Sequence, residues 1–292
     1  MKKDEKFSVL MSVYFKENPN YLDLSLKSIL IDQTILPTEV ILIEDGKLTD
    51  ELDNIILKYK NKFPKILKIY PFKNNQGLGK ALEIGLKKCK YNIVMRMDTD
   101  DIAVKNRFEL QLNYMKLHRD VSACGGFIAE FDKDPYTEEL RIKKMPSNYQ
   151  EVVQYAKFRN PLNHMTVCFR KKDILDVGNY QPLFYLEDHY LWSRLLVNGK
   201  KIENIPEVLV YARIGDGFLE RRGNKKYLDG WKKLQSYMYD NDFINLYEKC
   251  RNTLGMFVMT HVSSNVRSYL YNNILREKKK TNIEVVNCNE KK

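Results

Sequence analysis

The sequence predicts an α/β fold in which a mostly parallel β-sheet is flanked by helices. Short apolar runs rich in β-branched residues alternate with segments of helical periodicity over the first 120 residues. The runs are continuously apolar, which is typical of strands that are covered on both faces. Polar or acidic residues follow three of these runs, and such sheets bind their ligands beyond the carboxyl ends of the strands. The sequence therefore predicts both a fold and the edge where its site lies.

The first two strand-helix pairs occupy residues 7 to about 60. FSVLMSVY, residues 7–14, has the composition of a buried strand. The helix after it is indicated by apolar residues at helical spacing, namely Leu22, Leu26, Ile29 and Leu30. EVILIED, residues 39–45, is the second predicted strand. One face of the following helix would carry Leu48, Leu52, Ile55, Ile56 and Tyr59.

The next two strands are KILKIYP, residues 65–71, and YNIVMRM, residues 91–97. The helix between them contains glycines and repeats Leu78, Leu82 and Leu86 four residues apart. Beyond about residue 120 the pattern changes: VSACGGFIAEF, MTVCFRK and EVLVYARI read as strands, and LEDHYLWSRLLVNG reads as a helix. We expect these segments to extend the sheet edge and to wall the crevice beside it.

The positive charge of the chain is concentrated near its C-terminus. The net charge is +11, and residues 217–292 hold 15 Lys or Arg against 8 Asp or Glu. One helical stripe there would contain Val258, Val262, Val266, Tyr269, Leu270 and Ile274, with Arg267, Arg276 and Lys278 to Lys280 outside it. Two interpretations stay open: a helix packed on the rest of the protein, or an interfacial helix on anionic lipid.

Several classes of protein are disfavoured by the composition. The apolar run near the N-terminus is short and has no small-residue cleavage site, so we expect no signal peptide. No apolar stretch is long enough to span a bilayer, which predicts a cytoplasmic protein, peripheral on the inner membrane face if the basic helix binds lipid. Cysteines 89, 124, 168, 250 and 288 are far apart, which favours reduced thiols over a zinc site.

Acidic residues gather at the predicted strand ends. YFKEN, EDG and MDTDD would bring together Glu17, Glu44, Asp45, Asp98, Asp100 and Asp101 around one crevice. Carboxylates that share a crevice repel one another unless a cation holds them. Mg2+ and Mn2+ take oxygen ligands and commonly bridge carboxylates to substrate phosphates. The alternative is that Asp100 and Asp101 cap a helix beginning near Val104.

Two further segments are candidates for binding or catalysis. NNQGLGKA, residues 74–81, enters a helix through glycines, and its helix start with Lys80 could hold a phosphate or a sugar, or be a plain helix start. FYLEDHYLW places Glu187 and Asp188 at a helix start, where they act as caps or present a general base. His164, His189 and Trp192 are expected to have ordinary structural roles, because no metal-ligand spacing connects the histidines.

Taken together, these segments resemble glycosyltransferase family 2, the inverting GT-A enzymes of bacterial capsule, exopolysaccharide and lipopolysaccharide assembly. The resemblance is carried by SVLMSVYFKEN, SILIDQTILPTEVILIEDG, NNQGLGKALEIGLK, MRMDTDDI, NPLNHMTVCFRK with DVGNY, YLEDHYLWSRLLVNG and VYARIGDGFLERRG. It runs from about residue 7 to 224 in family order. It implies a GT-A catalytic domain at 1–223, with a nucleotide-sugar half to about 120 and an acceptor half after it. Residues 224–292 would form a basic helical extension.

The resemblance also implies roles for individual residues. The donor would be a nucleotide sugar, most often UDP-linked, and the acceptor a saccharide on a polyprenyl diphosphate. Asp100, with Asp98, would bind Mn2+ or Mg2+, and Asp98 would also contact the nucleoside. Asp188 would take the proton from the acceptor hydroxyl, and Glu187 would help to orient the substrates. The remaining nucleotide-sugar contacts would come from Tyr14, Glu17, Glu44, Asp45, Asn75, Gly77, Lys80, Arg96, Arg221 and Arg222.

Two departures from the family pattern concern the nucleotide contacts. The second strand ends in EDGKLTD where relatives usually have D-D-G-S-x-D, and Lys80 stands where arginine is frequent. A sugar nucleotidyltransferase is an alternative, but it should carry a Gly-rich basic loop near its N-terminus. A nucleic-acid-binding module is suggested by the net charge, yet carboxylates at the strand ends have the wrong sign for phosphate backbones. We therefore expect no nucleic-acid partner.

Overall fold

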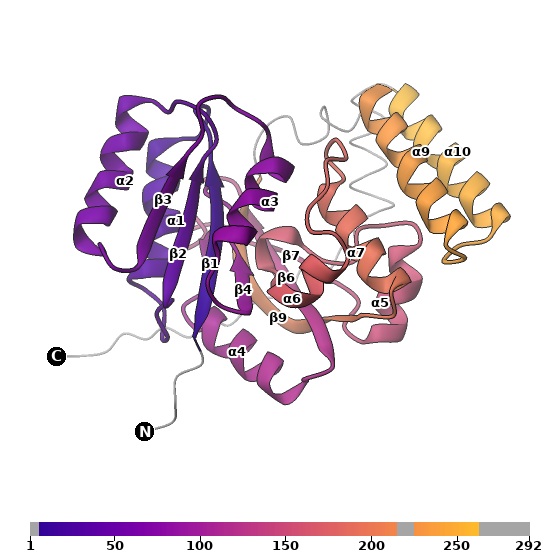
Figure 1. Cartoon of the computed structure of the whole chain (residues 1–292), viewed down its shortest axis with the longest axis horizontal. Helices are drawn as coiled ribbons and strands as arrows, with labels where there is room; N and C mark the ends of the chain where they lie inside the picture. Colours follow the sequence, from indigo (N-terminus) through magenta and orange to yellow (C-terminus); the bar gives the residue numbers. More distant parts are fainter. Residues whose placement is uncertain (1–5, 215–224, 263–292) are drawn as a thin grey trace.

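A computed structural model describes residues 6–214 and 225–262 of the chain. Its strands form one nine-stranded sheet in the order β3-β2-β1-β4-β8-β6-β9-β5, with β7 paired to β6 (Figure 1). The first half contains β1 (Phe7–Val13), α1 (Pro19–Leu30), β2 (Glu39–Glu44), α2 (Asp50–Lys62), β3 (Leu67–Pro71), α3 (Leu78–Lys88), β4 (Ile93–Arg96), β5 (Ile102–Ala103) and α4 (Arg107–Leu117). The second half contains β6 (Val121–Phe131), β7 (Arg141–Lys143), α5 (Tyr149–Ala156), η1 (His164–Thr166), β8 (Cys168–Arg170), α6 (Lys171–Asp176), α7 (Glu187–Val197) and β9 (Lys201–Arg213). Helices α9 (Lys225–Asp240) and α10 (Leu246–His261) follow.

The two faces of the sheet bury alternate residues of the same strands. In β1, Val9 and Met11 belong to a core cluster with α1, α2 and α4. Leu10, between them, belongs to a second cluster with α3, α5, α6 and α7. Because successive strand side chains point to opposite faces, a strand covered on both sides must be apolar throughout. This confirms the interpretation of the continuous apolar runs.

Helix α3 packs very closely on the sheet. A Cβ atom added at Gly85 would lie 2.5 Å from Leu10 Cδ1 and 3.0 Å from Ile43 Cγ1. Glycine at this position lets the helix backbone approach β1 and β2, so that the N-terminus of α3 lies over the carboxyl ends of these strands (Figure 1). The close packing therefore fixes one wall of the candidate site.

The predicted strands and helices of the first 120 residues are confirmed, with small differences at their ends. β1, β2, β3 and β4 pair in parallel. The second half differs more from the prediction, since β8 pairs antiparallel with both β4 and β6. β9 begins at Lys201, well before the predicted strand EVLVYARI, because it pairs with the whole length of β6. Helix α5 and strand β7 were not predicted.

The C-terminal helices α9 and α10 form a hairpin that packs beside α7 at the outer side of the molecule (Figure 1). Their core cluster includes Leu183 and Leu186, which immediately precede α7. Asn252 of α10 is buried and donates hydrogen bonds to Gln235 Oε1 at 3.0 Å and to the Lys157 carbonyl at 2.8 Å. The hairpin is thus bonded to the end of α5 as well as packed against the segment before α7.

The prediction that Val258 to Ile274 form one stripe on a single helix is wrong. Helix α10 ends at His261, and Val262 has extended backbone angles, φ −77° and ψ 152°. The rest of that stripe lies outside the described residues. Among residues 6–214 and 225–262, no helix has both the length and the apolar character needed to cross a bilayer.

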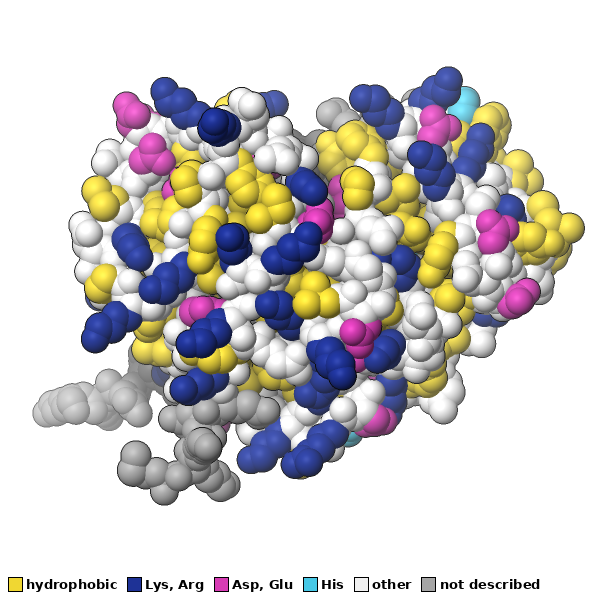
Figure 2. All heavy atoms as spheres, viewed as in Figure 1, with side chains coloured by type: hydrophobic (Ala, Val, Ile, Leu, Met, Phe, Trp, Pro, Cys, Tyr) yellow, Lys and Arg dark blue, Asp and Glu magenta, His cyan; other side chains and the backbone are white. Residues whose placement is uncertain are grey.

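Figure 2 shows one face of the molecule, with Lys and Arg side chains spread widely over it and hydrophobic side chains gathered at the outer edge near α10. Several α10 side chains are largely exposed: Leu246, Tyr247, Leu254, Phe257 and Val258. The Lys and Arg side chains of this face are thus not confined to the C-terminal hairpin, whose outer helix also exposes hydrophobic side chains.

Candidate active site

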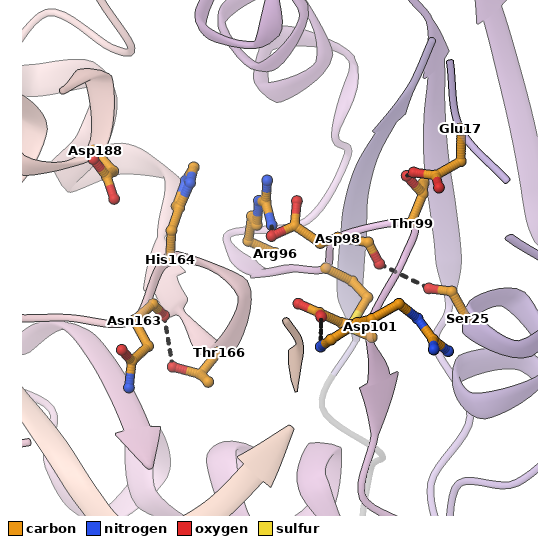
Figure 3. A network of polar contacts seen from close by, with 12 residues as sticks. Glu17, Ser25, Arg96, Asp98, Thr99, Asp101, Asn163, His164, Thr166 and Asp188 are labelled. Atoms are coloured by element: carbon orange, nitrogen blue, oxygen red, sulfur yellow. Dashed lines mark hydrogen bonds and ion pairs between the residues drawn. The ribbon is translucent and has the colours of Figure 1, made fainter. Parts of the chain in front are cut away.

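Three carboxylates meet where β4 ends. Oxygen atoms of Asp98, Asp100 and Asp101 all lie within 4.8 Å of one another. The buried Arg96 guanidinium forms an ion pair with Asp98, and Ser25 of α1 donates a hydrogen bond of 2.8 Å to the Asp98 carbonyl. Figure 3 shows Arg96 beside Asp98 and the Ser25 contact that holds this turn. The predicted D-x-D segment is therefore a fixed turn at the carboxyl edge of the sheet.

Asp101, besides lying with the other two carboxylates, holds the end of β9. Its Oδ1 accepts a hydrogen bond of 2.9 Å from the backbone amide of Arg213, and Arg213 Nε donates to the Asp100 carbonyl at 3.3 Å. The Arg213 guanidinium also lies 3.7 Å from the centre of the Tyr21 ring. The alternative that Asp100 and Asp101 cap a helix near Val104 is wrong, because α4 begins at Arg107 after Asn106. Asp101 instead ties the two halves of the sheet together.

The carboxylates carry more negative charge than their surroundings balance. Burial, together with the charges of Asp98 and Glu17, raises the pKa of Asp100 to about 7. Burial also raises the pKa of Glu17, whose Oε2 accepts a hydrogen bond of 2.5 Å from Thr99. The pKa of Asp101 is raised by burial and by Asp100. A hard divalent cation would relieve this repulsion, so the residues fit such an ion.

Asp45, at the end of β2, holds the loop that leads into α3. Its Oδ1 accepts from the Gln76 amide at 2.7 Å, and its Oδ2 accepts from the Gly77 amide at 2.9 Å. Asn75 Nδ2 donates to the Asp45 carbonyl at 3.1 Å. Gly77 has φ +86°, a conformation that favours glycine. The structure thus brings Asp45, Asn75 and Gly77 together, with the Asp45 carboxylate occupied by backbone amides.

The other predicted nucleotide-sugar residues are more scattered. Tyr14 follows β1 and is 42% exposed. Glu44 ends β2, and its pKa is raised by burial and by Asp53 of α2. Lys80 forms an ion pair of 2.7 Å with Glu83 along the exposed side of α3, and within the described part of the chain it forms no ion pair with the β4 carboxylates. Arg221 and Arg222 lie outside the described residues.

Glu187 and Asp188 begin helix α7. Asp188 Oδ2 accepts a hydrogen bond of 2.5 Å from Asn160 Nδ2, and its Oδ1 accepts from the His189 amide at 2.7 Å. Burial raises the pKa of Glu187 to about 7. Glu187 lies against α3, since a Cβ atom added at Gly79 would be 2.8 Å from Glu187 Cγ. These contacts bring the start of α7 to the start of α3.

His164 lies between the two acidic groups. Figure 3 shows Asp188 on one side and Asp98 with Arg96 on the other, with His164 between them. His164 Nε2 is 3.0 Å from the Tyr180 hydroxyl. Burial, reinforced by the charge of Arg96, lowers the pKa of His164 well below its usual value. A neutral His164 paired with Tyr180 therefore separates the carboxylates, in keeping with the structural role expected for this histidine.

Sequence reasoning did not single out Asn160, which orients Asp188 from 28 positions away, or Ser25, which holds the turn of Asp98. Asn160 does lie in the NPLNH segment that contributes to the family resemblance. No local pattern pairs Asn160 with the Asp188 carboxylate or Ser25 with the Asp98 carbonyl, since both contacts depend on the fold. The family resemblance of that segment is therefore the one feature of the sequence that could have pointed to Asn160.

The chain matches a family model and several known proteins. The family model described as glycosyl transferase family 2 matches residues 8–177. The chain is 36% identical over 271 residues to the UDP-Gal:alpha-D-GlcNAc-diphosphoundecaprenol beta-1,3-galactosyltransferase of Escherichia coli, covering 93% of this chain and 97% of that protein. It is 40% identical over 222 residues to the amylovoran biosynthesis glycosyltransferase AmsE of Erwinia amylovora, covering 76% and 81%.

A solved structure shares the fold over most of its length. The mannosyltransferase PcManGT from Pyrobaculum calidifontis, in complex with GDP-Man and Mn2+, superposes with a TM-score of 0.63 at 12% identity. The match covers 95% of this chain and 77% of that one. The arrangement of sheet and helices is therefore shared well beyond the range of clear sequence similarity.

Proposed function

Since this chain belongs to glycosyltransferase family 2 and has the GT-A fold, we propose that it transfers a hexose or N-acetylhexosamine from a UDP-sugar to a saccharide hydroxyl. It is a glycosyltransferase of surface polysaccharide synthesis, as its relatives are. The proposal adds the donor, the metal, the stereochemistry and a polyprenyl-diphosphate-linked acceptor. The observation that carries it is the pair of opposed acidic groups, Asp98 with Asp100 and Glu187 with Asp188.

The donor is proposed to bind along the carboxyl ends of β1, β2 and β4. The relative that covers most of this chain is named for UDP-Gal, which supports a UDP-sugar. Tyr14, Glu17 and Glu44 stand at these strand ends, and the Asp45-held loop with Asn75 and Gly77 forms the adjoining wall. Arg96 Nε has no hydrogen-bond partner among the described residues, although the side chain is buried. A buried hydrogen-bond donor of this kind suits an anionic or carbonyl group of the UDP-sugar.

Asp100 and Asp98 are the residues proposed to hold Mn2+ or Mg2+. Their carboxylates are hard oxygen ligands, and the pKa of Asp100 is raised by burial and then by the charges of Asp98 and Glu17, which a cation would offset. The Mn2+ in the mannosyltransferase of the same fold is consistent with this assignment. When bound, the ion would neutralise charge on the donor diphosphate. Asp101, which is bonded to Arg213, is left out of the proposed ligand set.

Asp188 is the proposed general base. Hydrogen bonds from Asn160 and from the His189 amide hold its carboxylate in one orientation, so an acceptor hydroxyl can donate its proton there. A single base that activates a hydroxyl for in-line attack implies inversion at the anomeric carbon. Glu187, at the contact between α7 and α3, would orient donor and acceptor where the two halves meet. Arg221 and Arg222 are proposed to contact the diphosphate on sequence grounds alone.

The acceptor is proposed to be a saccharide on a polyprenyl diphosphate at the inner membrane face. The support is the Escherichia coli relative, which is named for a lipid-diphosphate acceptor, GlcNAc-diphosphoundecaprenol. The 15 basic residues of positions 217–292 would favour an anionic membrane surface. Membrane binding by the C-terminal region therefore stays a prediction, as does the division into domains at residue 223.

The experiment that tests the proposal is a donor screen with a defined acceptor. Purified protein with Mn2+ would be given UDP-sugars and N-acetylglucosamine linked through a diphosphate to a short alkyl chain. We expect UDP release that depends on the acceptor, and a product one sugar heavier by mass spectrometry. The absence of both with every UDP-sugar, while a GDP- or dTDP-sugar is used, would refute the UDP-sugar assignment.

A further inference from the structure

A tight turn directly before the candidate base displays two aromatic rings. The Leu186 amide donates a hydrogen bond of 2.7 Å to the Leu183 carbonyl, which closes the turn over Phe184 and Tyr185. Tyr185 has φ +58°, the left-handed region that only glycine enters freely. A bulky residue in this region is strained, and such strain gathers at functional sites.

The residues on either side of the rings anchor the turn. Leu183 and Leu186 are 9% and 4% exposed and belong to the core cluster of the α9–α10 hairpin. Gly230 of α9 lies under the turn, since an added Cβ atom would be 3.6 Å from the Phe184 carbonyl and 3.5 Å from Leu186 Cδ1. The backbone of the turn is thus held firmly by buried contacts.

The two aromatic side chains are less buried than the leucines on either side of them. Phe184 is 41% exposed and Tyr185 is 46% exposed, and their ring centres are 4.1 Å apart. Both side chains are more than half covered, and Lys226 Nζ of α9 lies 5.8 Å from the centre of the Phe184 ring, but each side chain keeps an exposed part beside leucines that already anchor the backbone. The arrangement is better suited to holding a ligand against the rings than to stabilising the protein.

The turn is connected to the candidate active site. Tyr185 stands two residues before Glu187 and three before Asp188. Its backbone also hydrogen-bonds Glu187, which partly offsets the effect of burial on that carboxyl group. Because Glu187 touches Gly79 of α3, the turn lies on the acceptor side of the junction between the two halves. A sugar whose hydroxyl reaches Asp188 would pass close to these rings.

We propose that Phe184 and Tyr185 form a stacking platform for a pyranose ring of the acceptor saccharide. A pyranose has an apolar face of C–H groups and a polar edge of hydroxyls, so its face covers an aromatic ring while its edge keeps its hydrogen bonds. A ligand stacked there would be oriented for transfer to one hydroxyl. The inference rests on the proposed glycosyl transfer and adds the acceptor subsite.

The test separates a ligand role from a structural role through Tyr185→Gly. Glycine removes the ring and also relieves the positive φ, so the melting temperature should stay the same or rise. With the alkyl diphosphate acceptor, we expect the acceptor KM to rise about 10-fold while the donor KM and acceptor-independent UDP-sugar hydrolysis stay unchanged. Phe184→Ala should act in the same direction, and Tyr185→Phe should keep the acceptor KM within about 2-fold. Tyr247→Ala, at a 72% exposed tyrosine of α10, is the matched control and should have no effect.

Two results would overturn the platform. One is an unchanged acceptor KM in both Tyr185→Gly and Phe184→Ala while the wild-type protein transfers sugar. The other is a loss seen with the alkyl diphosphate acceptor but not with a lipid-free N-acetylglucosamine glycoside, which would assign the rings to the lipid instead of the sugar. Failure of the wild-type protein to transfer any sugar would count against the proposed function. Normal UDP-sugar hydrolysis in the variants would show that the donor site is intact, which distinguishes failure of the platform from failure of the proposed function.

Discussion

Asp188 is held by two hydrogen bonds before any substrate binds, and the shorter of them comes from a side chain. We predict that Asn160→Ala lowers kcat by about 10-fold to 100-fold, because Asp188 loses the 2.5 Å hydrogen bond that sets its orientation. The KM for the UDP-sugar should change little, since Asn160 stands on the acceptor side. Steady-state kinetics with both substrates varied measures the two effects separately.

The control for this variant is Asn241→Ala, which removes an asparagine side chain bonded to the Tyr237 carbonyl at the hairpin turn. It should leave kcat unchanged. A wild-type kcat in Asn160→Ala would show that Asp188 is oriented well enough by the His189 amide alone.

Glu187 is predicted to lower the stability of the protein in alkaline solution. Its pKa in the folded state is raised to about 7 by burial, above its value in the unfolded chain. As pH rises from about 4.5 through 7, Glu187 loses its proton in the unfolded chain but keeps it in the folded protein. The free energy of unfolding therefore falls over this range. Glu187→Gln should therefore be more stable than the wild type at pH 8, by about 2 kcal/mol, and equally stable near pH 4.5. Denaturant unfolding at the two pH values measures the difference, and equal stabilities at pH 8 would contradict it.

At this scale the sequence predicted the acidic residues better than their partners. Asp98, Asp100 and Asp188 follow a strand or begin a helix, and these positions can be read from local periodicity. The hydrogen bond from the Arg213 amide to Asp101 could not be predicted from the sequence, because the two residues are 112 positions apart. The positive φ of Tyr185 could not be read either, since a tyrosine gives no signal for a left-handed turn.

At the scale of elements, α3 and α7 meet closely at Gly79, where the absence of a side chain leaves room for Glu187. In Gly79→Ala, the new Cβ atom would lie 2.8 Å from Glu187 Cγ, so Glu187 must move. We predict a kcat about 10-fold lower, with a melting temperature close to that of the wild type because alanine favours the helix. Turnover and thermal unfolding of the same preparation measure both effects.

Gly255→Ala on α10 is the matched control, because an added Cβ atom there meets nothing within 4 Å. It should keep full activity and be slightly more stable than the wild type. Full activity in Gly79→Ala would indicate that the position of Glu187 does not matter for transfer.

Elements governed by local periodicity were predicted well, and elements governed by distant pairing were not. The helices α1, α2 and α3 carry regular apolar faces, and β1 and β2 are continuous apolar runs. The direction of β8 and the length of β9 depend on β6 as a pairing partner, which no local pattern encodes. The end of α10 at His261 was missed because the apolar spacing continues past it.

At the scale of the whole molecule, the basic C-terminal residues are predicted to direct the enzyme to anionic lipid. Removal of residues 263–292 should weaken sedimentation with anionic vesicles at low salt, because it removes most of the local excess of Lys and Arg. Transfer to a lipid-free acceptor should be kept, since the hairpin that supports Leu183 and Leu186 ends before this segment. Equal vesicle binding by the full and shortened chains would place the lipid-binding charge elsewhere.

The central claim is a division of labour between two acidic groups, with Asp100 holding the metal and donor and Asp188 activating the acceptor. The most direct test measures UDP-sugar affinity in the presence of Mn2+ by calorimetry, together with turnover, in Asp100→Asn and Asp188→Asn. We predict that Asp100→Asn loses both the metal-dependent affinity and transfer, whereas Asp188→Asn keeps the affinity and loses transfer by at least about 1,000-fold. Full transfer by Asp188→Asn, or unchanged metal-dependent affinity in Asp100→Asn, would contradict this division.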